Sequence, residues 1–474
     1  MKNNENNEKI ETLQASTTED ASLNKPINLG FLLKFSLPTI VSTLLQSTFG
    51  IVDGVFVSRI IDEYALSATS LVWPFLIFVL SLGFMFGVGG NALVAKELGE
   101  GKNVRARQNF SMIVVVSFAA TAVLSLFGLI FPSVVLNILG VSPEIYDIVL
   151  EYLVPLLWFL PAITIGVIFQ QFLITEGKAH LGMIATIIGG SLNMFLNWLL
   201  IYYLQWGLHG AALATSIGYT VSAVFGFAYF TYNRTRAGGL LYFVMPKFRI
   251  MVLAHSAVNG LSEMITGMAT SITGIFMNNI LMQLEGPMAV AAGGIMFAGM
   301  GIITSIFLGY IWGISPIISY NHGKGDSGRL QKIFKISIAA VSAMAVVAIA
   351  GSFAFTDLFI SIYITEPQVY FDGIWVTLPI VEMAHSGLRA ISLGYIFMAI
   401  NAFGSALFTA LNNGKISGLL SAMRTLVFVM LSLAVLPLIF GVDGVWFAMP
   451  VAEVLALFVT AFFVWRYRKV YKYA

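Results

Sequence analysis

The hydrophobic residues of this chain gather into runs of about twenty or more, which short polar stretches separate. A helix of about 20 residues crosses the hydrocarbon core of a bilayer. The pattern therefore predicts membrane-spanning helices rather than the core of a soluble domain. We predict twelve spans, at residues 31–57, 66–95, 109–131, 149–173, 181–204, 209–231, 251–283, 288–320, 333–356, 386–411, 416–440 and 443–465.

The runs do not alternate polar and apolar residues at every second position, which argues against a membrane β-barrel. Composition agrees with helical spans: 58% of the residues are hydrophobic and 10% are charged, whereas soluble domains carry about 25% charged residues. The predicted fold class is an all-α membrane protein. Residues 1–28 are polar, and we expect a disordered cytoplasmic tail without the apolar core of a signal peptide.

The positive charges sort to one side of the predicted spans. Of the 25 Lys and Arg residues, 22 lie near the N-terminus, in loops after even-numbered spans, or at the C-terminus. Cytoplasmic loops attract Lys and Arg, so both termini are predicted to be cytoplasmic in a multi-pass protein of the cell membrane. The basic loops thus report topology, and we expect no nucleic-acid partner.

Motifs of soluble enzymes are missing. The chain lacks HExxH, a P-loop and GxSxG, so we do not expect an enzyme. It contains no cysteine, which excludes disulfides and thiolate metal sites, and we predict no resident cofactor or metal. The stretch GFMFGVGG (83–90) lies inside an apolar span with no strand before it. We interpret it as close helix packing through small residues.

The two halves of the chain resemble each other. IVDGVFVSRI (51–60) aligns with SITGIFMNNI (271–280), and GLHGAA (207–212) aligns with GVDGVW (441–446). The difference in residue number between matching positions of the two halves grows by 15 from the loop after span 2 to the loop after span 4. The second half therefore holds extra residues around 357–385. Each half holds six spans, so we predict two pseudosymmetric six-helix bundles with substrate between them, as in alternating-access transporters.

These repeats set the expected domains: an N lobe (29–232), a cytoplasmic linker (233–250), a C lobe (251–465) and a basic cytoplasmic tail (466–474).

The order of motifs within the repeats is similar to that of multidrug and toxic compound extrusion (MATE) transporters, most of all to the MepA-like bacterial branch. The resemblance covers residues 29 to 465. It is carried by SLPTIV (36–41), IVDGVF (51–56), KELGEGK (96–102), LNMFLN (192–197), GLHGAALATS (207–216), NGLSEM (259–264), LRAISLGYIFMAIN (388–401) and GVDGVWFAMPVAE (441–453). The resemblance implies the MATE fold and a cation-coupled antiporter that exports small lipophilic organic cations or drugs in exchange for H⁺ or Na⁺.

The resemblance also implies roles for polar residues of the first half. Asp53 matches the coupling residue of span 1, with H⁺ or Na⁺ bound to it, and Pro38 matches the proline where this span bends. Asn193 and Thr215 match polar cavity residues of spans 5 and 6. Asn197 stands where the family often has a second carboxylate, which bears on any coupling ion that needs two.

In the second half, Glu263 matches a glutamate that other branches use for cation coupling. Asn401 stands where sodium-coupled relatives carry an aspartate. We therefore expect Glu263 and Asn401 at a substrate site or a second coupling site.

A carboxylate in a membrane span costs about 2.5–3.5 kcal/mol on insertion scales, so a function is the default explanation for Asp53. Its position predicts that it meets Asn193, Asn197 and Thr215 in the outer halves of their helices. The alternative is that Asp53 caps a helix bend or pairs with Arg59.

Two further charges, Arg424 and Glu453, lie within the predicted spans of the second half. Buried charges tend to pair. Two interpretations stay open for them: a structural ion pair, or charges that take part in coupling.

Two other transporter classes stay open. A flippase of lipid-linked oligosaccharide in the same superfamily would line its cavity with Arg or Lys for the diphosphate, and a major facilitator-type protein would carry an Asp-Arg-rich loop after span 2. The loop KELGEGKNVRARQ (96–108) lacks that pattern. An acidic or a basic cavity would separate export from flipping. The expected partners are the lipid bilayer, the exported cation and the coupling ion, for a monomeric protein.

Overall fold

The computed structural model describes residues 23, 25–60, 63–141, 143–235, 239–364, 368–371 and 374–474. Within these ranges, side chains are described except at 51, 54–60, 63–67, 144, 368–371 and 374–377. The predicted tail 1–28 falls largely outside the described residues.

The described chain is mostly helical. The N lobe consists of α2 (Leu29–Ile60), α3 (Glu63–Gly99), α4 (Asn103–Ile130), α5 (Pro132–Ile138), α6 (Tyr146–Thr175), α7 (Ala179–Asn197) and α8 (Gly207–Tyr232). The C lobe consists of α9 (Ile250–Asn259), α10 (Leu261–Glu285), α11 (Pro287–Lys324), α12 (Ser327–Tyr363), α13 (Pro379–Ser392), α14 (Tyr395–Ala410), α15 (Gly414–Ala422), α16 (Phe428–Phe440) and α17 (Val442–Tyr471). Short 3₁₀ turns lie at Pro143–Ile145 and Asn233–Thr235, and π-helical segments lie at Trp198–Tyr203 and Met423–Val427.

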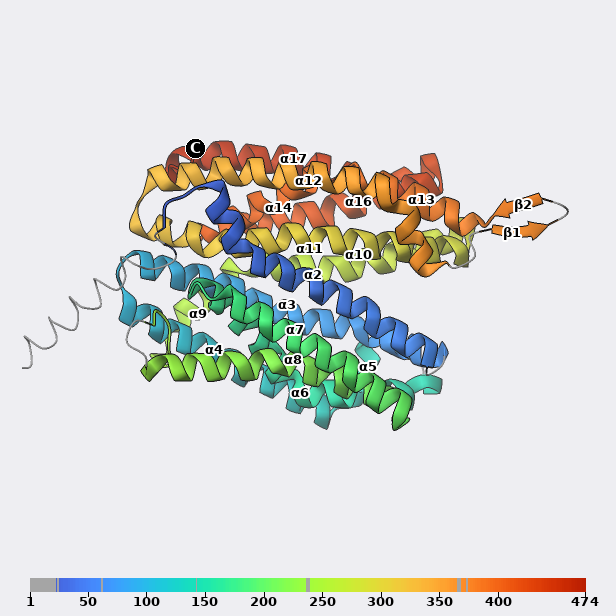
Figure 1. Ribbon diagram of the computed structural model, residues 1–474, viewed down its shortest axis with the longest axis horizontal. Helices are drawn as coiled ribbons and strands as arrows, with labels where there is room; N and C mark the ends of the chain where they lie inside the picture. Colours follow the sequence, from blue (N-terminus) through green and yellow to red (C-terminus); the bar gives the residue numbers. More distant parts are fainter. Residues whose placement is uncertain are drawn as a thin grey trace, which may run out of the picture.

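The lobes form two bundles side by side, with their helices running along the long axis of the molecule (Figure 1). The Lys- and Arg-rich segments lie at one end of the molecule. They adjoin the start of α4, the ends of α8 and α11, and the C-terminus after α17. We call this end of the molecule the basic end. The predicted two-bundle, all-α architecture is confirmed.

Ten helices in the described chain are long and apolar enough to cross a membrane, and the pair α13–α14, bent by 49°, makes an eleventh. The predicted span 251–283 divides at Gly260 into α9 and α10. Although α10 has 25 residues, its polar side chains leave it less apolar than the others. Such a composition suits a helix that faces protein or a cavity more than lipid.

Helix α2 contacts both lobes. In its first half, the Thr43 hydroxyl donates a hydrogen bond of 2.7 Å to the Ser305 carbonyl of α11. In its second half, the Gln46 amide donates to Gln170 Oε1 of α6 at 3.1 Å. Figure 1 shows α2 (dark blue) crossing from the C lobe to the N lobe. Pro38, the predicted hinge, lies in the half that packs on the C lobe.

The linker between the lobes is anchored to the N lobe. The Glu176 carboxylate accepts hydrogen bonds from the backbone N–H groups of Leu240 (3.0 Å) and Leu241 (2.8 Å). The Arg107 guanidinium donates to the Leu240 carbonyl at 2.9 Å and to the Tyr242 hydroxyl at 2.8 Å. Burial raises the pKa of Glu176, and these N–H groups oppose the rise. The linker therefore packs as part of the N lobe.

The glycine-rich stretch of α3 packs against the C lobe. A Cβ atom at Gly89 would overlap the Ser256 carbonyl and the Gly260 nitrogen. The side-chain amide of Asn259 donates to the carbonyls of Gly89 (3.3 Å) and Thr409 (3.0 Å), which joins the lobes at this point. These contacts show the close packing through small residues that the sequence predicts for residues 83–90.

Two more glycines extend this contact toward the basic end. A Cβ atom at Gly99 would overlap the Tyr320 carbonyl, and one at Gly323 would overlap the Lys96 carbonyl. We call the contacts of Gly89, Gly99, Gly260 and Gly323 the glycine seam. In this conformation the seam closes the space between the lobes at the basic end.

The substitution Gly89→Val is expected to open the glycine seam. The added side chain cannot fit against α9, and overpacking of this kind costs roughly 1–3 kcal/mol, or about 5- to 150-fold in the balance of closed and open seams. The measurement is the distance between spin labels at Lys102→Cys and Lys415→Cys, since the chain has no native cysteine. Gly301→Val is the control, because no heavy atom lies within 4 Å of its Cβ position. Equal distance distributions in both variants would contradict the expectation.

A short antiparallel hairpin interrupts the helices. Strands β1 (Gln368–Phe371) and β2 (Ile374–Thr377) pair with Gln368 opposite Thr377 and Phe371 opposite Ile374. The hairpin projects at the end of the molecule opposite the C-terminus (Figure 1). It occupies the region 357–385, where the repeat comparison places the extra residues of the second half.

Candidate functional site

The structure brings Asp53 together with polar residues from two other helices. The Asn197 amide of α7 donates to Asp53 Oδ1 at 2.6 Å, and the Thr215 hydroxyl of α8 donates to Asp53 Oδ2 at 3.1 Å. Asn197 and Thr215 are buried, with 0% and 7% of their surface exposed. Asn193 lines the same cavity as Asp53. The four residues that the sequence groups at span 1 thus share one site.

Local backbone features position these side chains. Gly189 of α7 and Gly218 of α8 cross so closely that a Cβ atom at Gly189 would overlap the Gly218 carbonyl, and this brings Asn193 and Thr215 to neighbouring helix faces. Asn197 ends α7 and directly precedes the π-helical segment Trp198–Tyr203. Such π-helical turns in membrane helices often mark functional sites, because they redirect side chains.

The site opens into a cavity of about 70 Å³, room for a few water molecules. Sequence reasoning missed part of its polar lining: Gln170 donates to the hydroxyls of Ser222 (2.9 Å) and Thr186 (3.2 Å), and Gln46 donates to Gln170. Gln46 and Gln170 could have been found as amides inside apolar spans. Both also line a neighbouring void of about 20 Å³ that reaches Trp312 of the C lobe.

The described lining of this cavity is acidic: it includes Asp53 and neither Lys nor Arg. Asn197 Oδ1 is buried without a hydrogen-bond partner. The oxygens of Asp53, Asn193, Asn197 and Thr215 can therefore bind a proton or a small cation. Across the described residues, no group of three His, Cys, Asp or Glu side chains has the arrangement of a metal site.

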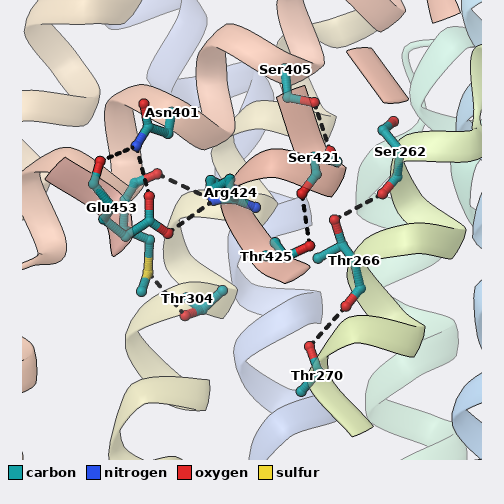
Figure 2. Close-up of polar contacts among 11 residues, drawn as sticks. Ser262, Thr266, Thr270, Thr304, Asn401, Ser405, Ser421, Arg424, Thr425 and Glu453 are labelled. Carbon is teal, nitrogen blue, oxygen red and sulfur yellow. Dashed lines mark hydrogen bonds and ion pairs between the residues drawn. The ribbon is translucent and has the colours of Figure 1, made fainter. Parts of the chain in front are cut away.

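A second polar cluster lies in the C lobe (Figure 2). Arg424 Nη1 lies 3.7 Å from Glu453 Oε1, and both side chains are 9% exposed. The Asn401 amide donates to Glu453 Oε2 at 2.7 Å and to the Glu453 carbonyl at 2.8 Å. Arg424 lies in the π-helical segment Met423–Val427, which aims it into the bundle. Asn401, which the sequence groups with Glu263, therefore bonds to Glu453.

Glu263 lies in the first turn of α10, just after the break at Gly260. Its carboxylate lies near Trp312 of α11 and within electrostatic range of Arg424 in the segment Met423–Val427. The Trp312 indole nitrogen is buried without a hydrogen-bond partner of normal geometry. Further along α10, the Thr266 and Thr270 hydroxyls donate to backbone carbonyls one turn earlier (Figure 2).

One sequence-based alternative lies outside the described side chains: the pairing of Asp53 with Arg59.

A family model described as MatE matches residues 38–199 and 264–434. The multidrug export protein MepA of Staphylococcus aureus strain MRSA252 is 24% identical over 424 residues, which cover 90% of each chain. MepA of Staphylococcus haemolyticus strain JCSC1435 is also 24% identical, over 92% of this chain and 93% of the relative. The predicted family and its MepA-like branch are confirmed.

Solved structures agree on the fold. An outward-facing multidrug resistance MATE family transporter of the MOP superfamily superposes with a TM-score of 0.85 and 19% identity, over 97% of this chain and 98% of the other. A MATE protein in complex with MaL6 gives a TM-score of 0.84 and 20% identity, over 94% of this chain and 97% of the other.

Proposed function

The chain belongs to the MatE family, and we propose that it is a cation-coupled antiporter that exports small lipophilic organic cations across the cell membrane. The relatives of similar length are named multidrug export proteins. The observation that carries the proposal is the acidic cavity at Asp53, whose oxygens suit H⁺ or Na⁺.

The sign of the charge favours export of cations over the flipping of lipid-linked oligosaccharides. A diphosphate needs Arg or Lys in the cavity, and the described lining at Asp53 has neither. In the C lobe, the buried Arg424 already pairs with Glu453 at 3.7 Å.

In the proposed cycle, the incoming ion binds to the Asp53 carboxylate and replaces the hydrogen bonds that Asn197 and Thr215 donate to it. A proton neutralises the carboxylate, and a sodium ion draws in the oxygens of Thr215 and Asn197, whose Oδ1 has no partner now. Either ion weakens the hold of Asn197 and Thr215 on α2. Because α2 also packs on α11 through Thr43 and Ser305, a change at Asp53 can be transmitted to the other lobe.

The exported compound needs a different place. Pockets for drug-sized ligands measure about 300–1,000 Å³, whereas the cavity at Asp53 holds about 70 Å³. We propose that the compound binds between the lobes, against the polar face of α10 that Glu263, Thr266 and Thr270 share. This face explains why α10 is less apolar than the other long helices.

The test is ethidium efflux by the full-length chain in energised vesicles or cells, with a pH gradient and a sodium gradient imposed separately. We expect ethidium export to follow one of the two gradients, which identifies the ion. Vesicles without the protein are the control. Absence of export under either gradient would refute the proposal.

A further inference from the structure

A long apolar groove runs along α12 in the C lobe. It has a volume of about 900 Å³ and lies between α12, α11 and the beginning of α2. Aliphatic and aromatic side chains dominate its lining, and the polar residues Ser352, Thr356 and Tyr395 complete it. The Thr356 hydroxyl donates a hydrogen bond to the Ser352 carbonyl. The groove belongs neither to the Asp53 cavity nor to the Arg424 cluster.

The groove follows one face of α12 for the thickness of a membrane. Residues of α12 that line the groove recur every three or four positions from Ile336 to Phe359. At 1.5 Å per residue, this stretch of helix is about 35 Å long. The hydrocarbon core of a bilayer is about 30 Å thick. The lining includes Ala343, Val347 and Phe355, which are exposed on the outside of the bundle. The groove is therefore open to the side that faces lipid.

The described part of the N lobe is closely packed where α4 meets α6. There α4 packs directly on α6: the Ser125 hydroxyl donates to the Leu157 carbonyl at 2.6 Å, and the Leu157 side chain fills the space beside Gly128. In α12, by contrast, no heavy atom lies within 4 Å of a Cβ atom built at Gly351. The volume of the groove, about 900 Å³, is large enough for a ligand.

Three lysines mark the end of the groove at the basic end. Lys34 follows the lining residue Leu33, and Lys332 and Lys335 each lie one helical turn before a lining residue of α12. All three are exposed, and none forms an ion pair with a described carboxylate. Lysines at the mouth of an intramembrane groove are the arrangement that attracts anionic lipid headgroups.

We propose that this groove binds an anionic glycerophospholipid, with its acyl chains along α12 and its phosphate at Lys34, Lys332 and Lys335. Acyl chains fit a lining without charge, and the phosphate matches the three lysines. A lipophilic cation fits less well, because no carboxylate lines the groove and the lysines repel it. This site is independent of the proposed export function.

The test is native mass spectrometry of the full-length chain with palmitoyl-oleoyl phosphatidylglycerol, and with phosphatidylcholine of the same chains. The double variant Lys332→Gln/Lys335→Gln is expected to bind phosphatidylglycerol about 30-fold more weakly, since each basic residue near an anionic headgroup contributes a factor of roughly five. Gly351→Phe places a ring in the groove at a position where no heavy atom lies within 4 Å of the Cβ atom, and it should lower the binding of both lipids at least tenfold. Ala343→Phe is a second filling variant if Gly351→Phe does not fold.

Matched controls keep the charge and volume changes but leave the groove intact. Lys415→Gln/Lys469→Gln removes two lysines elsewhere at the basic end, and Val346→Phe adds a ring to α12 outside the groove. Both should bind phosphatidylglycerol like the wild type. Equal binding of the two lipids in all variants would overturn the proposal in favour of unspecific boundary lipid.

Two other results would also overturn it. If the lysine variant weakens binding but neither filling variant does, the headgroup binds without the groove. If the filling variants abolish binding of tetraphenylphosphonium but not of phosphatidylglycerol, the groove takes a lipophilic cation.

Discussion

Asp53→Asn is expected to abolish gradient-driven export while the protein remains folded. Asparagine has the shape of aspartate, and its carbonyl oxygen can still accept the hydrogen bond that Asn197 now donates to Asp53 at 2.6 Å. It cannot take up a proton near neutral pH, and it offers a cation a neutral oxygen in place of a carboxylate. We expect uphill ethidium export to fall at least tenfold, to the level of vesicles without the protein, in the efflux measurement under the gradient that drives the wild type.

The matched control is Asp357→Asn. Asp357 is 84% exposed and pairs with His385 at 2.8 Å, far in sequence from the Asp53 site, and its loss should leave export unchanged. A second readout is the exchange of labelled ethidium across the membrane without an ion gradient. A variant that has lost only its coupling to the ion still exchanges ethidium, whereas an inactive protein does not. Undiminished gradient-driven export by Asp53→Asn would rule out Asp53 as the coupling residue.

Glu453→Leu is expected to destabilise the protein strongly. The substitution removes the 3.7 Å ion pair of the buried Arg424 guanidinium. The guanidinium keeps its hydrogen bond to the Met398 carbonyl at 3.5 Å. Removing one partner of a buried pair typically costs about 3–5 kcal/mol, because the other charge stays in a low-dielectric interior. Thermal unfolding of the purified chain in detergent should show a markedly lower midpoint than that of the wild type.

The double variant Arg424→Met/Glu453→Leu should recover most of this stability, since replacing both charges with apolar side chains of similar size is often neutral. Glu382→Gln, at an exposed position of α13, is the control and should unfold like the wild type. A single variant as stable as the wild type would contradict the prediction. Export by the double variant then separates the two interpretations of the pair: wild-type rates indicate a structural pair, and lost export in a stable protein indicates a role in transport.

Much of the Asp53 site is predictable from the sequence, because the free-energy cost of a polar side chain in an apolar span depends on that residue and its neighbours in the chain. A carboxylate or amide in an apolar span is unfavourable unless it has partners, so Asp53, Asn193, Asn197 and Thr215 stand out before any fold is known. The direction of each span then places them at one depth. The hydrogen bonds from Asn197 and Thr215 to Asp53 agree with this expectation. Gln46 and Gln170 obey the same rule.

The C-lobe cluster was less predictable, because its partners depend on how helices are aimed. Arg424 and Glu453 are recognisable as buried charges, but the hydrogen bond of Asn401 to Glu453 instead of Glu263 depends on the turn of α14 against α17. The π-helical segment Met423–Val427 inserts an extra residue into a helical turn and so changes the face on which Arg424 lies. Hydrophobic periodicity does not reveal such a segment.

The sequence by itself determined the features that follow from the free energy of transfer into a bilayer: the long apolar helices, the two similar halves, the side of the basic loops and the place of the extra residues that form the β1–β2 hairpin. Only the tertiary structure decided which helix of one lobe contacts the other. The division of α2 between the lobes, the break at Gly260, the glycine seam and the groove along α12 depend on contacts between residues far apart in the chain. Lipid-facing and protein-facing side chains are both apolar in a membrane protein, so hydropathy cannot distinguish a packed surface from a groove that lipid fills.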